Sequence, residues 1–335
     1  MRNLCASVLL ALLAAAAVPT LHADTIEEVK KSAGQGDKDS QYNLALRYQT
    51  GKGVEQDVDK AVDWYRKAAG QGHKKAQTNL GNLYRAGKGI DRDYAEAMRW
   101  YRMAADQGDT KAKINIAMMY ARGEGVKKDE AEGLKWLYEA AGAGDTQAMV
   151  QLATMYKTGK SVDKNQEKSV EWFRLAAVKG DVVAQHNLGL SYFTGKGNRK
   201  DAAESVKWHR KAANKGYPPA EYSLALRYAR GEGIKQDYSE AANWYRKAAK
   251  HGHSSAQNNL GLMYRKGQGV GKDYEEALEW FQKAAERGHT LAQFNLGNMY
   301  LKGQGTRQDR EEARKWFTRA AEHGHKGARK ALESK

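Results

Sequence analysis

Histidines paired across a single glycine are the residues of this sequence that most suggest a chemical site. His251-Gly-His253 and His323-Gly-His325 have a close spacing, and imidazole is a common zinc ligand. Four histidines, however, directly follow a glycine at a position where other segments carry aspartate: His73, His253, His289 and His325, against Asp37, Asp109, Asp145 and Asp181. Neither an acidic residue nor a cysteine stands at ligand spacing from them. We therefore interpret them as turn or helix-capping residues, and we predict no metal site and no cofactor.

Two short motifs of β-lactamases also occur, and both would place a nucleophile beside a lysine. Lys157-Thr158-Gly159 reads K-T-G, and the residues from Ser161 to Lys164 read S-x-x-K. In those enzymes the motifs lie on separate elements that converge in space. Here they are almost adjacent, and Thr154 stands where a phosphate-binding loop would need its first glycine. We interpret both motifs as chance and predict no catalytic residues.

The first 23 residues predict a secretory signal peptide. Arg2 precedes an almost wholly apolar run over residues 4–18, which is short for a membrane span, and residues 21–23 offer a cleavage site. An uncleaved anchor is the alternative. Cleavage would remove Cys5, the only cysteine, so the mature protein would work without disulfides in an oxidising compartment. We expect a periplasmic or secreted protein with no transmembrane span and no nucleic-acid partner.

The rest of the chain repeats every 36 residues, which predicts the elements that would carry any site. Glycine, at 34 residues, is abundant because it recurs in fixed columns, one of which runs from Gly36 to Gly324 and another from Gly51 to Gly303. A period of this length is typical of a solenoid. All 8 tryptophans follow the same period: Trp64, Trp100, Trp136, Trp172, Trp208, Trp244, Trp280 and Trp316.

Residues 73–108 show what one unit contains. Apolar residues from Ala76 to Tyr84 recur at helical spacing, and Gly87 is placed to end that helix. Asp93 is placed to begin a second helix, with Glu96 at the capping-box position. We therefore predict an all-α, right-handed α-solenoid of antiparallel helix pairs. Its expected parts are a signal peptide (1–23), an N-terminal capping helix (24–36), eight repeats (37–324) and a C-terminal capping helix (325–335).

The unit Ala-x-x-Asn-Leu-Gly-x-x-Tyr-x-x-Gly-x-Gly, followed by Asp, Ala, Trp-Tyr and Ala-Ala at fixed spacing, resembles the Sel-1-like repeat of the tetratricopeptide-like superfamily. The resemblance covers nearly all of the chain after residue 23. It implies a non-catalytic adaptor, and exported bacterial members are associated with cell-envelope complexes, exopolysaccharide export, sensor regulation or host contact. One cysteine-rich exported group is associated with β-lactamase activity, but this chain lacks that group's cysteines.

A stripe of amides on the predicted first helix of each unit is one part of the expected binding site. In tetratricopeptide proteins, which the units resemble, this stripe faces a concave groove, where such side chains can hold a ligand's backbone or carboxylate. The alternative is that the amides bond locally and support the adjacent helix. The asparagines that we assign to the groove are Asn43, Asn79, Asn115, Asn187, Asn259 and Asn295, together with Asn82 one turn further along.

Two neighbouring columns of the same helix vary in size and polarity from unit to unit, and we assign their larger members to the groove as well. A residue that only supports the stack should vary less, and exposed apolar patches commonly mark interaction sites. The alternative is that these side chains form extra core between helices. The assigned residues are Tyr42, Met118, His186, Leu190, Tyr222, Leu226 and Phe294, together with Phe193, which extends the set next to Leu190.

The formal net charge of +16 fits an acidic partner, although repeated pairs such as Arg66-Lys67 and Arg210-Lys211 suit a solvated face equally well. We expect a monomer that binds a protein or peptide in the groove. The alternatives are a scaffold associated with an anionic envelope polysaccharide, and a β-lactamase-like hydrolase.

Overall fold

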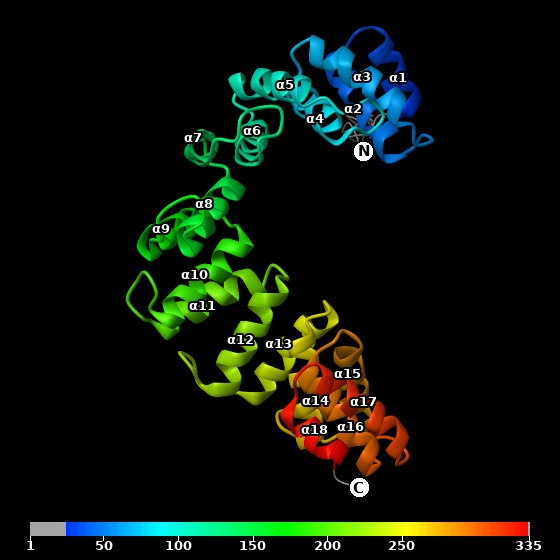
Figure 1. Ribbon diagram of the computed structural model, residues 1–335, viewed down its shortest axis with the longest axis vertical. Coiled ribbons are helices and arrows are strands. Elements are labelled where there is room, and N and C mark those ends of the chain that lie inside the picture. Colours follow the sequence, from blue (N-terminus) through cyan, green and yellow to red (C-terminus); the bar gives the residue numbers. More distant parts are fainter. Residues whose placement is uncertain (1–24, 334–335) are drawn as a thin grey trace, which may run out of the picture. The chain divides into compact units, whose positions relative to one another are not determined.

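A computed structural model describes residues 25–333, and within that range every regular element is an α-helix. The predicted signal peptide lies outside the described residues. Within each of the two units described below, the helices form antiparallel pairs stacked as the expected right-handed α-solenoid, and a single helix begins and ends the series (Figure 1). The chain divides into two compact units, up to Asp129 and from Glu130, and each is described by itself.

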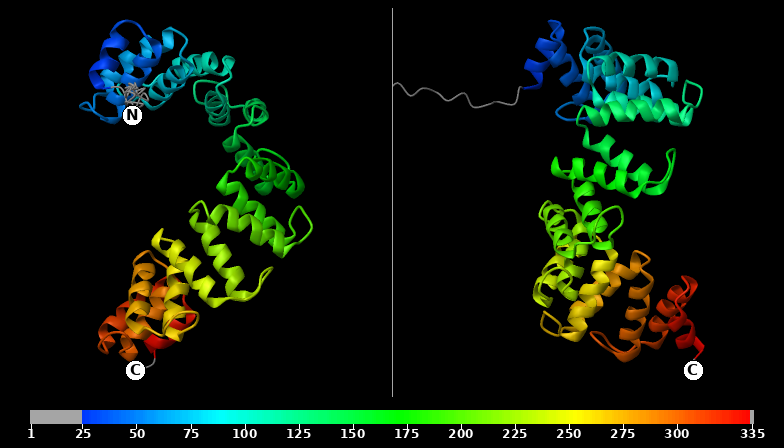
Figure 2. Two further views of the ribbon diagram at one scale, coloured as in Figure 1. Left: turned by 180° about the vertical axis from the view of Figure 1, so that it is seen from behind. Right: turned by 90° about the vertical axis from the view of Figure 1, so that its left-hand side faces the viewer.

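The first unit contains α1 (Ile26–Gly34), α2 (Lys38–Thr50), α3 (Val58–Gly70), α4 (Lys74–Ala86), α5 (Tyr94–Asp106) and α6 (Thr110–Arg122). The second begins with α7 (Glu130–Gly142), α8 (Thr146–Thr158), α9 (Gln166–Val178), α10 (Val182–Thr194), α11 (Ala202–Ala213) and α12 (Pro218–Arg230). It ends with α13 (Tyr238–Lys250), α14 (Ser254–Lys266), α15 (Tyr274–Glu286), α16 (Thr290–Lys302), α17 (Arg310–Glu322) and α18 (Lys326–Glu333). Even-numbered helices are called first helices below, and odd-numbered ones second helices. Figure 2 shows the pairs of each unit from two further sides.

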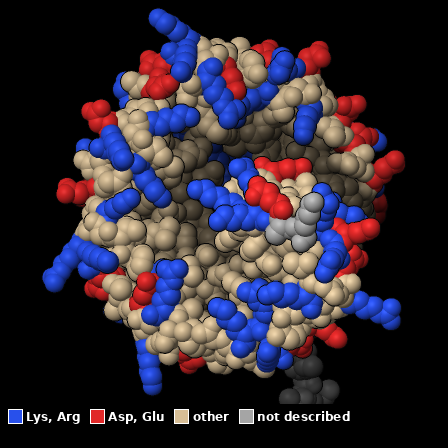
Figure 3. Space-filling view, turned by 60° about the horizontal axis from the view of Figure 1, so that its bottom comes forward, with Lys and Arg blue, Asp and Glu red and all other residues tan. Residues whose placement is uncertain are grey.

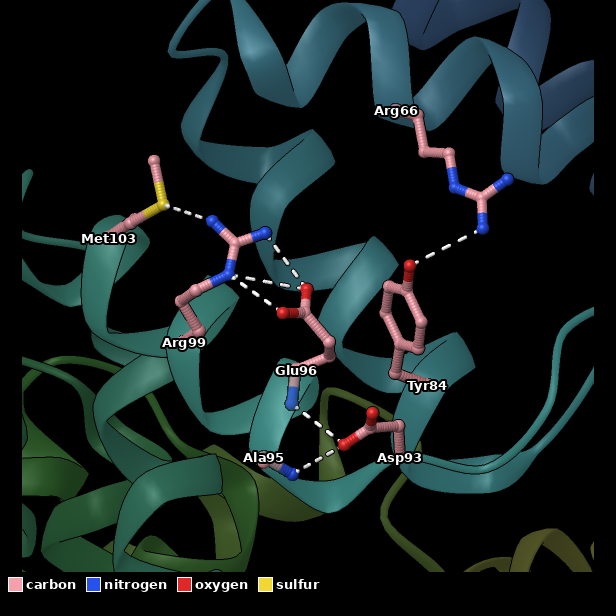
Figure 4. Close-up of polar contacts among 7 residues, drawn as sticks. All are labelled: Arg66, Tyr84, Asp93, Ala95, Glu96, Arg99 and Met103. Atoms are coloured by element: carbon pink, nitrogen blue, oxygen red, sulfur yellow. Dashed lines mark hydrogen bonds and ion pairs between the residues drawn. The ribbon is translucent and has the colours of Figure 1, made fainter.

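The helices begin and end where the sequence predicts, because most boundaries carry a residue that caps the helix; α12, which follows Tyr217, has prolines in its first turn instead. Asp93 accepts hydrogen bonds from the backbone N–H groups of Ala95 and Glu96 at the start of α5 (Figure 4). Gly87 adopts the left-handed conformation, with φ of 65°, at the end of α4. The expected capping box is wrong at Glu96, whose carboxylate pairs instead with Arg99 at 2.8 Å. A reciprocal box is present at Thr25 and Glu28.

Close packing depends on small residues that face large ones across each pair. In α4, Ala76 and Leu80 are fully buried, whereas Tyr84 is only half-buried. Gly81 faces the ring of Tyr101 on α5 so closely that a Cβ atom would lie 2.7 Å from it. A methyl group there would have to displace the ring or the helix, so a small residue at this position sets the distance between paired helices.

Many of the repeated basic residues on the second helices make contacts within the scaffold. Arg66 donates a hydrogen bond to the Tyr84 hydroxyl on the next helix, at 3.4 Å (Figure 4), and three further arginines repeat this contact 18 residues before a tyrosine: Arg102, Arg210 and Arg246. Lys67 lies 4.0 Å from the ring centre of Trp64, within range of a cation–π interaction. Lys and Arg are spread over the face that Figure 3 shows, with acidic residues among them. Part of the positive charge therefore serves contacts between and within the helices.

Candidate functional site

All residues assigned to the groove lie on first helices, and they divide between the two units. The first unit holds Tyr42 and Asn43 on α2, Asn79 and Asn82 on α4, and Asn115 and Met118 on α6. The second holds His186, Asn187, Leu190 and Phe193 on α10, Tyr222 and Leu226 on α12, Asn259 on α14, and Phe294 and Asn295 on α16. Asn43 and Asn82 are exposed and the others are half-buried. Their assignment to a binding groove remains a prediction.

The asparagine stripe makes hydrogen bonds within the solenoid. The Nδ2 atom of Asn79 donates to the hydroxyl of Tyr65 at 3.1 Å, and Asn259 repeats this bond to Tyr245 at 3.2 Å. These tyrosines lie on the preceding second helices, so the amides connect the two helix layers. The pattern favours the local role that the sequence left open. Each amide keeps a second N–H donor that can serve a ligand, whereas the oxygen of Asn259 already accepts from Asn258 at 3.3 Å.

The aromatic side chains of the variable column stack on the residue that caps the next first helix. The ring of Tyr222 lies 4.5 Å from that of His253 with an interplanar angle of 20°, and Phe294 lies 4.3 Å from His325 at 27°. Tyr42 stacks on His73 in the same way. These stacks explain why the column varies in size, because its aromatic members pair with rings of the following repeat. The variation of this position from repeat to repeat therefore has a structural cause and does not by itself indicate binding.

The histidines after the turn glycines are helix caps, as predicted. The Nδ1 atom of His73 accepts a hydrogen bond from the backbone N–H of Ala76 at 3.0 Å, and His253, His289 and His325 do the same on α14, α16 and α18. Among residues 25–333, no group of three or more histidine, cysteine, aspartate or glutamate side chains is placed to hold a metal ion.

One contact between a buried and a half-buried histidine in the second unit was not recognised from the sequence. His209 on α11 is only 1% exposed, its Nε2 atom has no hydrogen-bond partner, and its ring centre lies 5.2 Å from that of His186. Burial lowers the pKa of His209 to about 3 and that of His186 to about 4, so both rings are neutral at physiological pH. His209 occupies the position of Phe173, Phe281 and Phe317 in other repeats, which was the available signal.

A stripe of leucines on the second unit's first helices is partly exposed. Leu190, Leu226 and Leu262 occupy the same position on α10, α12 and α14, and none is fully buried. Asn82 and Asn298 hold this position in other repeats, so the stack does not require an apolar residue there. Next to the stripe, the guanidinium carbon of Arg227 lies 3.5 Å from the centre of the Phe193 ring. Arg227 is itself buried and pairs with Glu232 at 2.8 Å, so the partly exposed part of this surface is apolar.

In the first unit, two open cavities adjoin at the beginning of the first helices. One, of about 530 Å³, is lined by residues that include Lys38, Asn43 and Lys75, and the other, of about 270 Å³, reaches Lys111. Tyr42, Lys74 and Lys75 line both. Tyr42 and Asn43 were predicted as site residues from the sequence, whereas the lysines were not, because Lys and Arg are spread over the whole chain.

Comparison with known proteins agrees with this architecture. A family model described as the Sel1 repeat matches eight consecutive segments: residues 38–73, 74–109, 110–145, 146–181, 182–217, 218–253, 254–289 and 290–325. No match was found among curated proteins. Within residues 25–333, none of the helices has both the length and the apolar character that crossing a membrane requires.

Two solved structures are similar over most of this chain. The protective antigen c5321 of uropathogenic Escherichia coli, described as displaying an SLR fold, is 36% identical with a TM-score of 0.78. The match covers 91% of this chain but only 66% of that protein. A Sel1 repeat protein from Oxalobacter formigenes is 32% identical with a TM-score of 0.71, and the match covers 92% of this chain and 90% of the other.

Proposed function

Because the chain belongs to the Sel1 repeat family, whose members are typically scaffolds for protein interaction, we propose that it is an exported, non-catalytic scaffold that binds a protein or peptide partner on its first helices. The partner would belong to a cell-envelope complex or a regulatory system. A periplasmic or secreted location is supported by the apolar segment at residues 4–18 and by the similarity to a protective antigen, since such an antigen must be accessible to antibodies.

The partly exposed leucine stripe of α10, α12 and α14 is the observation that carries this proposal. Leu190, Leu226 and Leu262 repeat on three successive first helices, although Asn82 and Asn298 are accepted at the same position elsewhere. These side chains are not needed for stacking and stay partly in contact with water. Covering them with a partner removes apolar surface from water, which makes the free energy of binding more favourable. Binding would therefore depend on a position that carries leucine in some repeats and asparagine in others, while the helices that carry it stay the same.

The test replaces the stripe with a residue that the scaffold already uses at that position. The variant Leu190→Asn/Leu226→Asn should keep its helicity, because asparagine occupies the position on α4 and α16. A matched control changes two exposed apolar residues on a second helix, Leu175→Asn/Val178→Asn. Each protein is crosslinked in cells of its source organism, and co-purified proteins are quantified by mass spectrometry.

We expect specific envelope proteins to be strongly depleted from the stripe variant and retained by the control. Fully burying an exposed leucine contributes ~1.5–3 kcal/mol, so covering two partly exposed leucines should contribute ~1.5 kcal/mol or more in total, which corresponds to at least about tenfold in affinity. If both variants capture the same proteins in the same amounts as the unchanged chain, the stripe is not the binding surface and the proposal is wrong.

A further inference from the structure

We propose that the groove lined by Lys38, Lys74, Lys75 and Lys111 in the first unit binds an acidic peptide segment of a partner protein. This inference rests on the proposed function, since it specifies the chemistry of a protein partner. It concerns a different surface from the leucine stripe, which lies on the second unit, so the two can be tested separately.

The groove is continuous across three repeats. The cavity of about 530 Å³ contains Lys38 from α2 together with Lys74 and Lys75 from α4. The cavity of about 270 Å³ contains the same two lysines of α4 together with Lys111 from α6. Because Lys74 and Lys75 line both cavities, a single extended ligand could follow the four ammonium groups from one helix to the next. This arrangement suits a chain better than a small ion.

The four ammonium groups have no ionic partner among the described residues. On second helices, by contrast, lysines pair with a glutamate three residues earlier, as Lys135 does with Glu132 and Lys207 does with Glu204. Two aspartates also line the groove, Asp39 in the larger cavity and Asp109 in the smaller one. Asp39 accepts from His73 at 3.3 Å, and Asp109 accepts from the backbone N–H of Ala112 at the start of α6. Neither contact removes the negative charge of a carboxylate, because a backbone N–H is neutral and burial lowers the pKa of His73, so four ammonium groups and two carboxylates leave the groove with a net positive charge of two.

These lysines do not stabilise the helices that carry them. Lys74 and Lys75 occupy the first turn of α4, where the positive end of the helix dipole disfavours a cation. In the second unit the matching positions carry no charge on α8, α10, α12, α14 or α16; on α8, for example, they are Thr146 and Gln147. A local choice that opposes helix stability, and that other repeats avoid, is typical of a functional position.

The lining favours the carboxylates of a peptide over those of a sugar polymer. The ammonium group of lysine is a point charge on a flexible stem, so it adapts to carboxylates at varied positions. The exposed amide of Asn43 can bond to a peptide backbone. Tyr42, the aromatic residue of the groove, already stacks on His73 at 4.4 Å and packs against Tyr65, which leaves it poorly placed to stack on a sugar ring.

The test uses the full chain and a defined probe. A fluorescein-labelled peptide of repeated Glu-Glu-Ser-Gly units is titrated with protein, and its fluorescence anisotropy is compared with that of a Gln-Gln-Ser-Gly counterpart at low and physiological salt. The groove variant is Lys74→Thr/Lys75→Gln/Lys111→Gln, which takes its residues from Thr146 and Gln147 of α8. A control variant removes the same charge from exposed positions of the second unit: Lys235→Gln, Lys266→Gln and Lys302→Gln.

We expect the glutamate peptide alone to bind, with a loss of at least ~tenfold in affinity in the groove variant and less than ~twofold in the control. Equal losses in both variants would mean that only net charge matters, and would overturn the inference. It would also fall if polygalacturonate bound with the same dependence on the three lysines while the peptide did not bind. If the acidic peptide fails but capture still depends on the leucine stripe, the inference is wrong and the proposed function stands.

Discussion

The stack between Tyr222 and His253 decides how the variable column of the first helices should be understood, and a double-mutant cycle measures it. We would change Tyr222→Ile and His253→Asp, singly and together. The double variant recreates the pair that the chain already uses at Ile114 and Asp145. Aspartate at the cap keeps the bond to the helix N-terminus, because Asp145 accepts from the backbone N–H of its own first turn at 3.0 Å. Tyr222→Ile also removes the tilted ring contact with Tyr245, at 5.8 Å, but this loss is the same with either residue at position 253, so the cycle subtracts it and isolates the stack.

The expected size of the effect follows from the geometry. The two rings are 4.5 Å apart and nearly parallel, and aromatic pairs of this kind contribute ~0.5–1.5 kcal/mol beyond their buried area. The coupling free energy should lie in this range. Urea unfolding at pH 8 measures it with His253 neutral, because burial lowers the pKa of that side chain. A coupling within ~0.3 kcal/mol of zero would refute the role of the stack in holding repeats together. The same double variant should still capture partners if the column serves packing alone.

Three further predictions concern single positions. Ser161→Gly should stabilise the protein by about 1 kcal/mol in urea unfolding, because Ser161 has a φ of 63° where the other repeats use glycine; no gain would show that the loop is unstrained. His209→Phe should reduce the loss of stability on acidification. Burial lowers the pKa of His209 to about 3, so the unfolded chain binds a proton below pH 6.5 and the native chain does not, and stability present at neutral pH falls by about 2 kcal/mol at pH 5. An unchanged pH profile of melting temperature would contradict this. N-terminal sequencing of the protein from its source cells should begin at or near Asp24, whereas a chain that retains Met1 would favour the anchor.

The sequence predicts most of the fold because the residues that begin and end the helices recur at the same positions in each repeat. Asp93 and Gly87 mark helix ends by chemistry that acts locally, and they recur eight times with little change. The positions of α1 and α18 follow from the same register. The glutamate after each capping aspartate was misjudged at Glu96, because a nearby Arg99 offers a stronger partner than the backbone N–H.

The candidate site was harder to predict because its contacts cross from one repeat to the next. Phe294 stacks on His325, which lies 31 residues later in the next repeat. Their two repeat positions vary together, but this is seen only when residues 31 apart are compared. The lysine groove was missed for a similar reason. Lys38, Lys75 and Lys111 are ordinary surface residues in the sequence, and only their meeting in adjoining cavities distinguishes them from the lysines of second helices.

The most direct test of the binding surface is photo-crosslinking in the source cells. Benzoylphenylalanine is placed either at Leu262, in the leucine stripe of α14, or at Val178, exposed at the end of α9. If the stripe is the binding surface, the probe at Leu262 forms discrete protein adducts that disappear when Leu190→Asn/Leu226→Asn is added, and the probe at Val178 forms none of them. Adducts from Val178 alone, or adducts from Leu262 that persist in the stripe variant, would contradict it.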